Sequence, residues 1–285
     1  ATILGISSLI IGSTVVSVGT DISEIINSIV SCSLGHGDID VGDSVGSNLT
    51  QLTLVFGLLP IICGTFYVNR KSFLIIGSCE ILSLILIFTV VEKGYFTRLD
   101  AFFMMGSFIF YTMITYNVTK SDNLDRVNLM IGQEKIKSKK YHLTICAFAF
   151  FGVTVCSYVI VQSVVVLSSF FTVPKYIISF FLVSIGTSLP ELAVDVAALK
   201  QKHYNIAIGD IIGSCIVDST ISIAIGQALF PQAVTAAYAV PTILFTICAS
   251  IIVVILVAKR KRTDKKSGIL FISIYFFSYF LLLVF

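Results

Sequence analysis

Nine long apolar runs divide this chain and leave little room for a water-soluble domain. They cover residues 2–33, 41–66, 72–91, 100–117, 141–170, 174–199, 206–230, 238–258 and 267–285. About 20 apolar residues cross a bilayer as a helix, and most of the runs reach that length. Charged residues make up only 12% of the chain, against roughly 25% in soluble domains. The sequence therefore predicts an all-α polytopic protein of the cell membrane.

Basic residues mark every second loop between these runs. The alternate loops hold only Lys93, Arg98 and Lys175. Because Lys and Arg favour the cytoplasmic side, this alternation predicts nine crossings, with Ala1 inside and Phe285 outside. The basic loops contain Arg70, Lys71, Lys120, Arg126, Lys135, Lys137, Lys139, Lys140, Lys200, Lys202, Lys259, Arg260, Lys261, Arg262, Lys265 and Lys266.

Each half of the chain contains one copy of a gapless internal repeat. The first copy reads SVGTDISE and then GDSVGSNLTQ, and the second reads SIGTSLPE and then GDIIGSCIVD. Glu191 follows Glu24 by 191 − 24 = 167 residues, and the same offset aligns the other Gly, Ser, Thr and acidic positions. By the loop charges, the two copies cross the membrane in opposite directions. Inverted repeats are typical of secondary transporters, which bind their ions near the membrane midplane.

This repeat predicts two inverted halves. The first half covers residues 1–117 and the second covers residues 141–285. The polar stretch 118–140 between them is predicted to be a cytoplasmic linker. Because an ionisable side chain inside a membrane segment is expensive, each one is a candidate functional group.

Glu24 and Glu191 are the symmetric centre of the repeat. Each follows a Gly-Thr pair, where glycine permits a break that frees carbonyl oxygens to face a cation. Thr20 stands four residues before Glu24, and Thr187 four before Glu191, so each pair is predicted to share a helix face.

The second motif adds further oxygen ligands. Ser47 and Gln51 are four residues apart, as are Ser214 and Asp218. Carboxylates, hydroxyls and amides are hard ligands that suit Ca²⁺ or Na⁺. Small polar residues also hold membrane helices together. Carboxylates gathered for that purpose alone would repel one another or stay protonated.

Other acids depart from a simple symmetric site. Asp21 stands where the second copy has Ser188. Asp43 and Asp210 each lie in a Gly-Asp-x-x-Gly-Ser motif. They are either N-cap or first-turn acids, favoured by the helix dipole, or a cation or proton site on the access path. Glu80 lies outside the repeats.

The motifs GTSLPE and GDIIGS, with the diverged copies GTDISE and GDSVGS, resemble the alpha repeats of the cation/calcium antiporter superfamily. The resemblance is closest to the prokaryotic sodium/calcium exchangers. It implies an inverted-repeat transporter fold of five plus five helices, with cations bound among the second, third, seventh and eighth. Since nine runs are found, it places the tenth helix before Ala1.

The resemblance also implies roles for individual residues. Glu24 and Glu191 match calcium ligands, with carbonyl oxygens at Thr20 and Thr187. Asp218 matches the central acid of the second repeat. Serines match flanking sodium positions, namely Ser17, Ser47, Ser184 and Ser214. The departures from the family pattern are Gln51 and the acids Asp43 and Asp210 for Asn, Asp21 for Ser, and Ser23 for Pro.

The sequence predicts an antiporter that exchanges Ca²⁺ for Na⁺ by alternating access. The extra acids keep open a proton-coupled exchanger of Ca²⁺ or another divalent cation. A cation channel is disfavoured by the inverted repeats and by the lack of a filter-like carbonyl motif. No enzyme is expected, since there is no Ser-His pair or HExxH motif. The expected partners are inorganic cations and the lipid bilayer, with no cofactor and no nucleic acid; nothing in the sequence indicates an oligomeric state.

Overall fold

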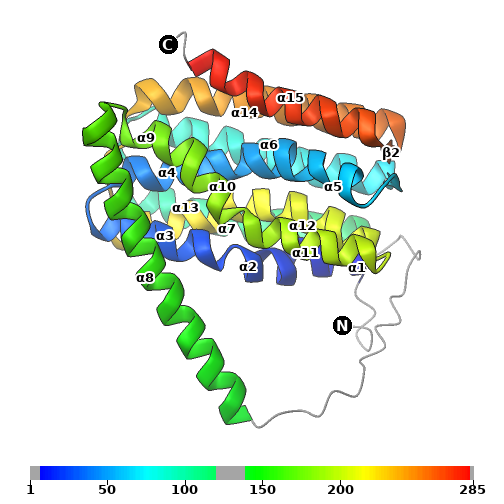
Figure 1. Ribbon diagram of the computed structural model, residues 1–285, viewed down its shortest axis with the longest axis horizontal. Coiled ribbons are helices and arrows are strands. Elements are labelled where there is room, and N and C mark those ends of the chain that lie inside the picture. The colour runs from blue at the N-terminus through cyan, green and yellow to red at the C-terminus, as the bar shows by residue number, and fades with distance from the viewer. Residues whose placement is uncertain (1–6, 120–138, 283–285) are drawn as a thin grey trace.

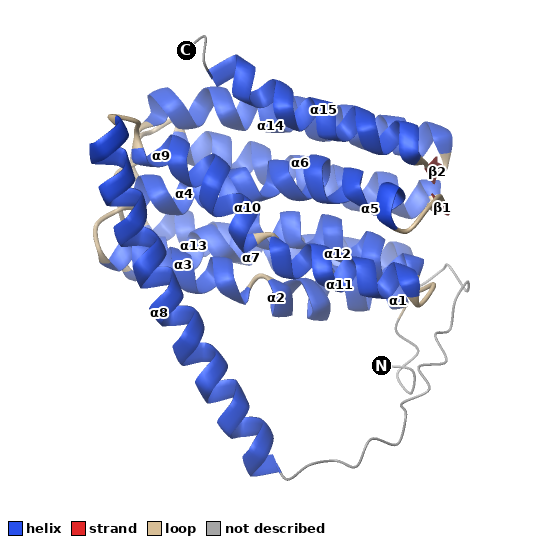
Figure 2. Cartoon of the chain, viewed as in Figure 1, coloured by secondary structure: helices blue, strands red, loops and turns tan. Residues whose placement is uncertain are grey.

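The computed structural model describes residues 7–119 and 139–282, and this part of the chain is almost entirely helical (Figures 1 and 2). Most helices lie side by side in one bundle, while α8 crosses it obliquely at one end and extends beyond it. The helices of the first half are α1 (Ser8–Ile11), the π-helical turn η2 (Gly12–Val16), α2 (Ser17–Thr20), α3 (Ile22–Ser33), α4 (Gly37–Leu49), the π-helical turn η3 (Thr50–Val55), α5 (Phe56–Ile62), α6 (Arg70–Val91) and α7 (Arg98–Thr119).

The second half repeats this order of elements. The helices of the second half are α8 (Lys139–Phe171), α9 (Lys175–Ile178), η4 (Ser179–Val183), α10 (Ser184–Thr187), α11 (Leu189–Lys200), α12 (Tyr204–Val217), η5 (Asp218–Ser222), α13 (Ile223–Leu229), α14 (Ala236–Arg260) and α15 (Lys265–Leu282). A short antiparallel strand pair, β1 (Phe66–Tyr67) with β2 (Arg262–Thr263), connects the two halves.

The helices agree with the predicted apolar runs to within a few residues. Seven of the described helices are long and apolar enough to cross a membrane, or eight if the bent pair Ser8–Thr20 and Ile22–Ser33 is one span. The ninth predicted run coincides with α15, which is not among these candidate spans. Most of the predicted linker, residues 120–138, lies outside the described residues.

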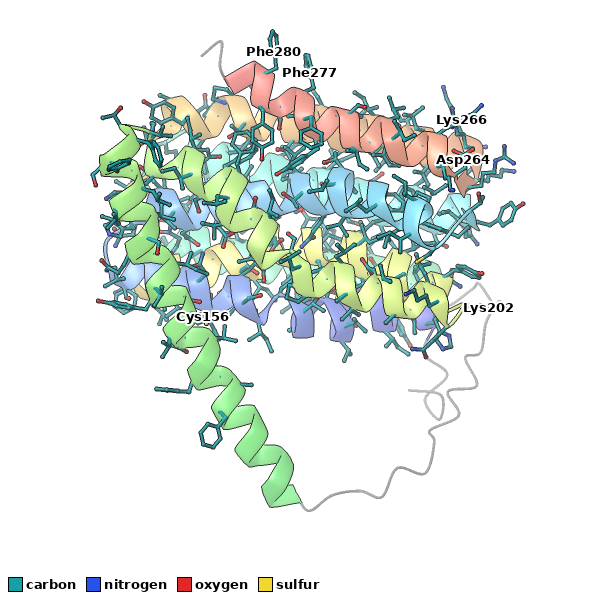
Figure 3. All side chains as sticks on the ribbon, in the orientation of Figure 1. Cys156, Lys202, Asp264, Lys266, Phe277 and Phe280 are labelled. Atoms are coloured by element: carbon teal, nitrogen blue, oxygen red, sulfur yellow. The ribbon has the colours of Figure 1, made fainter. Side chains whose placement is uncertain are left out.

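The loops sort to the two ends of the bundle as their charges predict. Pairing of β1 with β2 joins the loop after the second run to the loop after the eighth, and Lys202 and Lys266 lie at that same end (Figure 3). At the opposite end, the Phe96 amide donates to the Gln232 carbonyl at 3.0 Å. The Thr235 amide there donates to Asp38 at 2.7 Å. The basic loops after the second, sixth and eighth runs therefore share one face.

The repeat is visible as helix irregularities at matching positions. The turn η2 recurs as η4 at the same positions, and η3 recurs as η5, which begins one residue later and ends at the matching residue. The α-helix also breaks at Asp21 and at the matching Ser188, with nearly the same backbone angles, φ −77° and ψ 10° against φ −83° and ψ 4°. In the first copy the break bends the helix by 43°. π-Helical turns are rare and are frequently found at functional sites.

Reciprocal contacts show that a two-fold axis relates the copies. A Cβ on Gly46 would overlap the backbone of Phe180, and a Cβ on Gly213 would overlap Ser13. These are the same contact with the copies exchanged, which is the mark of a two-fold relation. The absence of a side chain at both glycines lets the helices touch backbone to backbone.

The contacts also give the direction of each copy. Gly42 lies against Tyr176, and Thr50 bonds to Ser184 at 3.3 Å, so α4 and the α9–α10 stretch run in parallel. Because α4 turns back on α3 through residues 34–36, the first copy begins in the direction opposite to the second. The predicted inverted arrangement is therefore confirmed.

The bundle buries its polar helices at the centre. Of the most apolar 18-residue segment between the start of α4 and the end of α5, 78% is buried inside the bundle. For the corresponding segment of α12 to α13 the share is 89%. Apolar packing surrounds them, for example between Phe56 and Phe271, whose ring centroids lie 5.7 Å apart. The outer helices therefore shield the two central stretches from lipid.

Gly46→Ala tests the close crossing at the two-fold. The added methyl group must displace the Phe180 backbone, so we expect the free energy of unfolding to fall by about 1–3 kcal/mol, as overpacking does elsewhere. The matched control is Gly106→Ala on α7, where a Cβ meets nothing within 4 Å. Thermal unfolding in detergent measures both variants. An equal melting temperature for Gly46→Ala and the parent would contradict the crossing.

Candidate metal centre

Three buried carboxyl groups meet at the helix breaks. Oxygens of Asp21, Glu24 and Glu191 all lie within 4.8 Å of one another, and each residue is at most 2% exposed. Asp21 occupies the break itself, while Glu24 and Glu191 lie in the first turns of α3 and α11. The breaks thus turn the acids of both copies towards one point. We refer to these three residues as the central cluster.

The breaks also correct one prediction. Thr20 ends α2 while Glu24 belongs to α3, and Thr187 ends α10 while Glu191 belongs to α11. Neither pair therefore shares the face of one continuous helix. The four-residue spacing assumed a regular helix, which the Gly-Thr break interrupts.

The threonines instead bond to serines of the opposite copy. Thr20 Oγ1 lies 3.5 Å from Ser214 Oγ, and Thr187 Oγ1 lies 3.2 Å from Ser47 Oγ. These two contacts are again one contact with the copies exchanged. The structure thus brings both predicted Thr and Ser positions to the same interface.

Gln51 and Asp218 mark the two-fold axis. They are equivalent residues, 167 positions apart, and Gln51 Nε2 donates to Asp218 Oδ2 at 3.3 Å. The thiol of Cys215 donates to Gln51 Oε1 at 3.3 Å and so holds the amide in place. Oδ1 of Asp218 has no hydrogen-bond partner among the described residues. That oxygen is free to bind a cation.

Asp43 and Asp210 are not helix caps. Each lies about one and a half turns inside its helix, so the N-cap and first-turn interpretation is wrong. Asp43 accepts from Thr187 Oγ1 at 3.0 Å and from Asn27 Nδ2 at 2.6 Å. Asp210 accepts from Ser17 Oγ at 3.1 Å. Both helices begin earlier than the apolar runs suggested, which places these acids in the bundle interior.

The remaining predicted serines are buried beside the breaks. Ser184 Oγ lies 3.3 Å from Thr50 Oγ1. Ser188, the counterpart of Asp21, is 1% exposed, and its hydroxyl has no partner among the described residues. The residues predicted for the site therefore lie at or near the two breaks, and all are buried except the half-buried Thr20.

Several interior polar groups were missed from the sequence. Asn48 Oδ1 accepts from Ser219 Oγ at 3.0 Å beside the axis, and Asn27 binds Asp43. Asp40 accepts from Gln227 Nε2 at 2.7 Å. The available signal was a polar residue inside an apolar run. Outside the repeats, Glu80 has a partner, since Ser250 Oγ donates to it at 2.8 Å.

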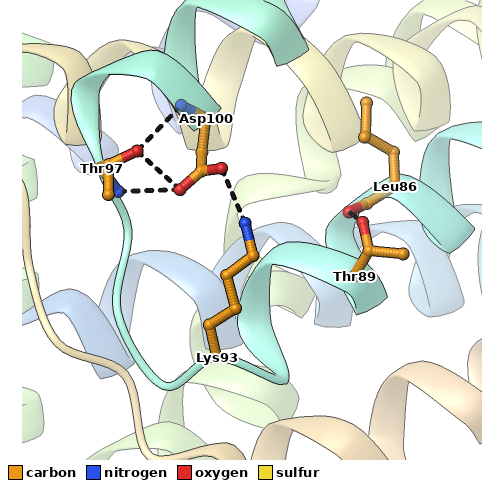
Figure 4. Close-up of polar contacts among 5 residues, drawn as sticks. All are labelled: Leu86, Thr89, Lys93, Thr97 and Asp100. Carbon is orange, nitrogen blue, oxygen red and sulfur yellow. Dashed lines mark hydrogen bonds and ion pairs between the residues drawn. The ribbon is translucent and has the colours of Figure 1, made fainter.

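No basic side chain neutralises these acids in the described part of the chain. The two ion pairs found there are Lys93–Asp100 at 3.0 Å (Figure 4) and Arg260–Asp264 at 3.6 Å, both at helix ends. Buried carboxylates without counter-charge are strongly destabilising. Metal cations or protons must therefore balance the charge. The buried acids around the breaks are Asp21, Glu24, Asp43, Glu191, Asp195, Asp210 and Asp218.

Comparison with known proteins identifies the family of this chain. The model of the family described as sodium/calcium exchanger protein matches residues 1–117 and 141–284. The chain belongs to the sodium/calcium exchanger family. It is therefore a multi-pass integral membrane antiporter and not an enzyme, and its substrates are inorganic cations.

Individual relatives agree with this assignment. The putative antiporter CaxA of Alkalimonas amylolytica is 28% identical over 83% of this chain and 75% of its own length. The sodium/calcium exchanger MaX1 of Methanosarcina acetivorans is 24% identical over 95% of this chain and 88% of its own. The exchanger NCX_Mj, soaked with 100 mM Na⁺ and 10 mM Sr²⁺, superposes with a TM-score of 0.66 at 25% identity, covering 96% of this chain and 86% of that one.

Cation binding should stabilise this exchanger measurably. We expect Ca²⁺ to relieve the repulsion in the central cluster, so that at 100 times its dissociation constant it adds about 2.7 kcal/mol to the free energy of unfolding. In Glu24→Gln we expect a higher melting temperature without cation and a smaller rise with Ca²⁺. Differential scanning fluorimetry in EGTA and in Ca²⁺ measures both. An undiminished Ca²⁺-induced rise in the variant would remove Glu24 from the site.

Proposed function

We propose that the protein exchanges Ca²⁺ for Na⁺ by alternating access, with Ca²⁺ held by the central cluster. The observation that carries this is the approach of Asp21, Glu24 and Glu191 to within 4.8 Å of one another. Ca²⁺ takes six to eight oxygen ligands in flexible geometry. Three carboxylates provide both the oxygens and the charge that a divalent cation requires.

Neighbouring groups complete the proposed calcium site. Asp218 offers the unpartnered Oδ1 on the two-fold axis, and Gln51 lies beside it. The carbonyl oxygens of Thr20 and Thr187 lie at the ends of the helices before each break. These oxygens are hard ligands, as Ca²⁺ prefers.

The hydroxyl groups support sodium sites on either side of the centre. Ser47 pairs with Thr187, and Ser214 pairs with Thr20, at symmetric positions. The remaining sodium ligands are Ser17, Ser184 and Ser188, with Asp43 and Asp210 nearby. Na⁺ at these positions shares the cluster carboxylates with Ca²⁺. Because both ions would use the same carboxylate oxygens, each ion displaces the other.

The closed centre supports alternating access. The cluster residues are at most 2% exposed, so ions reach them only after the bundle opens. In inverted-repeat transporters the two halves rock about a fixed site and open it to each face in turn. The matched breaks in α2–α3 and α10–α11 are the natural places for this movement.

A proton-coupled exchanger is the second candidate, and Asp21 is the observation that favours it. Asp21 places a carboxyl group in the cluster where the matching Ser188 has a hydroxyl. A carboxyl group can release and take up a proton during the cycle, whereas a serine hydroxyl cannot. The two candidates share the calcium site and differ in the counter-ion.

Calcium uptake into proteoliposomes separates the candidates. A sodium gradient at equal pH on both sides should drive ⁴⁵Ca²⁺ uptake, because Na⁺ leaving the vesicle supplies the free energy. A pH gradient without Na⁺ should drive little. Uptake that follows the pH gradient alone would overturn sodium coupling and establish the second candidate.

Glu191→Gln tests the calcium ligands. Loss of one cluster carboxylate should reduce ⁴⁵Ca²⁺ uptake at least a hundredfold, while the variant still folds. The matched control is Glu80→Gln, which alters an equally buried acid that bonds to Ser250 outside the cluster. Its uptake should stay within about twofold of the parent. Normal uptake by Glu191→Gln would refute the assigned ligand.

A further inference from the structure

A second group of unsatisfied acids lies next to the central cluster. The helices α11 and α12 pack together, and Asp195 on α11 and Asp210 on α12 interact electrostatically across this contact. Both residues are 0% exposed. Both oxygens of Asp195 and Oδ2 of Asp210 have no hydrogen-bond partner in the described part of the chain. Ser17 donates to the remaining oxygen of Asp210 at 3.1 Å.

The pair lies between the central cluster and one end of the bundle. The helices α11 and α12 are joined by the turn at residues 201–203 and pack together. Asp195 and Asp210 each stand about one and a half turns from it, roughly 8 Å at 1.5 Å per residue. Glu191 is about one turn deeper. Lys202 marks this end of the bundle (Figure 3).

The other copy of the repeat shows what Asp210 lacks. Asp43 is the counterpart of Asp210, and donors satisfy both of its oxygens, from Asn27 at 2.6 Å and from Thr187 at 3.0 Å. The residue that matches Asp195 is Ser28. One copy therefore gives this buried acid two donors, while the other places a second acid against it.

We propose that Asp195 and Asp210 form a second cation site, separate from the central cluster, that binds Na⁺. Two ionised carboxyl groups buried side by side are strongly unfavourable unless a cation or a shared proton lies between them. Three free carboxylate oxygens and the nearby Ser17 hydroxyl are hard ligands. The choice of Na⁺ rests on the exchange proposed above. The site lies between the central cluster and the Lys202 end. It assigns the Na⁺ placed above near Ser17 and Asp210 to a carboxylate pair that the other copy of the repeat lacks.

Asp195→Asn is the sharpest test, because it keeps the shape of the side chain. The new amide can donate to Asp210 as Asn27 donates to Asp43, so the variant should fold and melt no lower than the parent in cation-free detergent. ²²Na⁺ binding to the purified full chain should fall by one ion per protein, or the affinity of that ion should fall at least tenfold. ⁴⁵Ca²⁺ binding without Na⁺ should stay within about twofold.

Two further variants make the result decisive. Asp195→Ser restores the residue of the matching position and should lose the same Na⁺, which separates loss of the carboxylate from any effect of the new amide. Glu80→Gln removes a buried acid that has a donor and should lose none.

An unchanged number and affinity of Na⁺ ions in both Asp195 variants would overturn the site. So would loss of Ca²⁺ in place of Na⁺. If the parent protein itself binds no Na⁺, the sodium coupling fails together with this site, and that outcome is recognised without any variant.

Discussion

The constraint that governs this structure is the free-energy cost of burying carboxyl groups that have no basic partner. Seven such groups surround the helix breaks in the described chain, and the ion pairs found there lie at the helix ends. Isolated charges in the interior cost far more than a folded protein's net stability. The centre is therefore stable only with cations or protons bound. A protein whose interior requires cations in this way is suited to binding and releasing them.

Glycine packing makes this concentration of acids possible. At Gly46 and Gly213 the two copies touch backbone to backbone, and this brings the breaks of both copies to one point. The breaks then aim Glu24 and Glu191 towards each other. The acids and the close crossings are parts of one arrangement, because the repulsion among the carboxyl groups would otherwise separate the helices.

The sequence predicted what the repeat makes symmetric. The fixed offset identified Glu24 and Glu191 as a pair, and the loop charges gave the inverted directions that the contacts of α4 confirm. Of the residues that occur in one copy only, it predicted Asp21 but not the contacts made by Asn27 and Asp195. Asn27 matches a valine and Asp195 matches a serine, so their contacts with Asp43 and Asp210 depend on packing. Breaks near the Gly-Thr pairs were expected. That they place each threonine and its glutamate on different helices became clear only from the structure.

The differences between the copies make the two faces of the site unequal. In an inverted repeat, opening to either face exchanges the conformations of the two halves. Two identical halves would make the two open states equal in free energy and equal in ion affinity. Asp21 against Ser188, and Asp195 against Ser28, break this equality. Each adds a carboxyl group to one side of the axis, so each favours cation binding from one face. The symmetric residues provide the site, and the unmatched acids make its two openings differ.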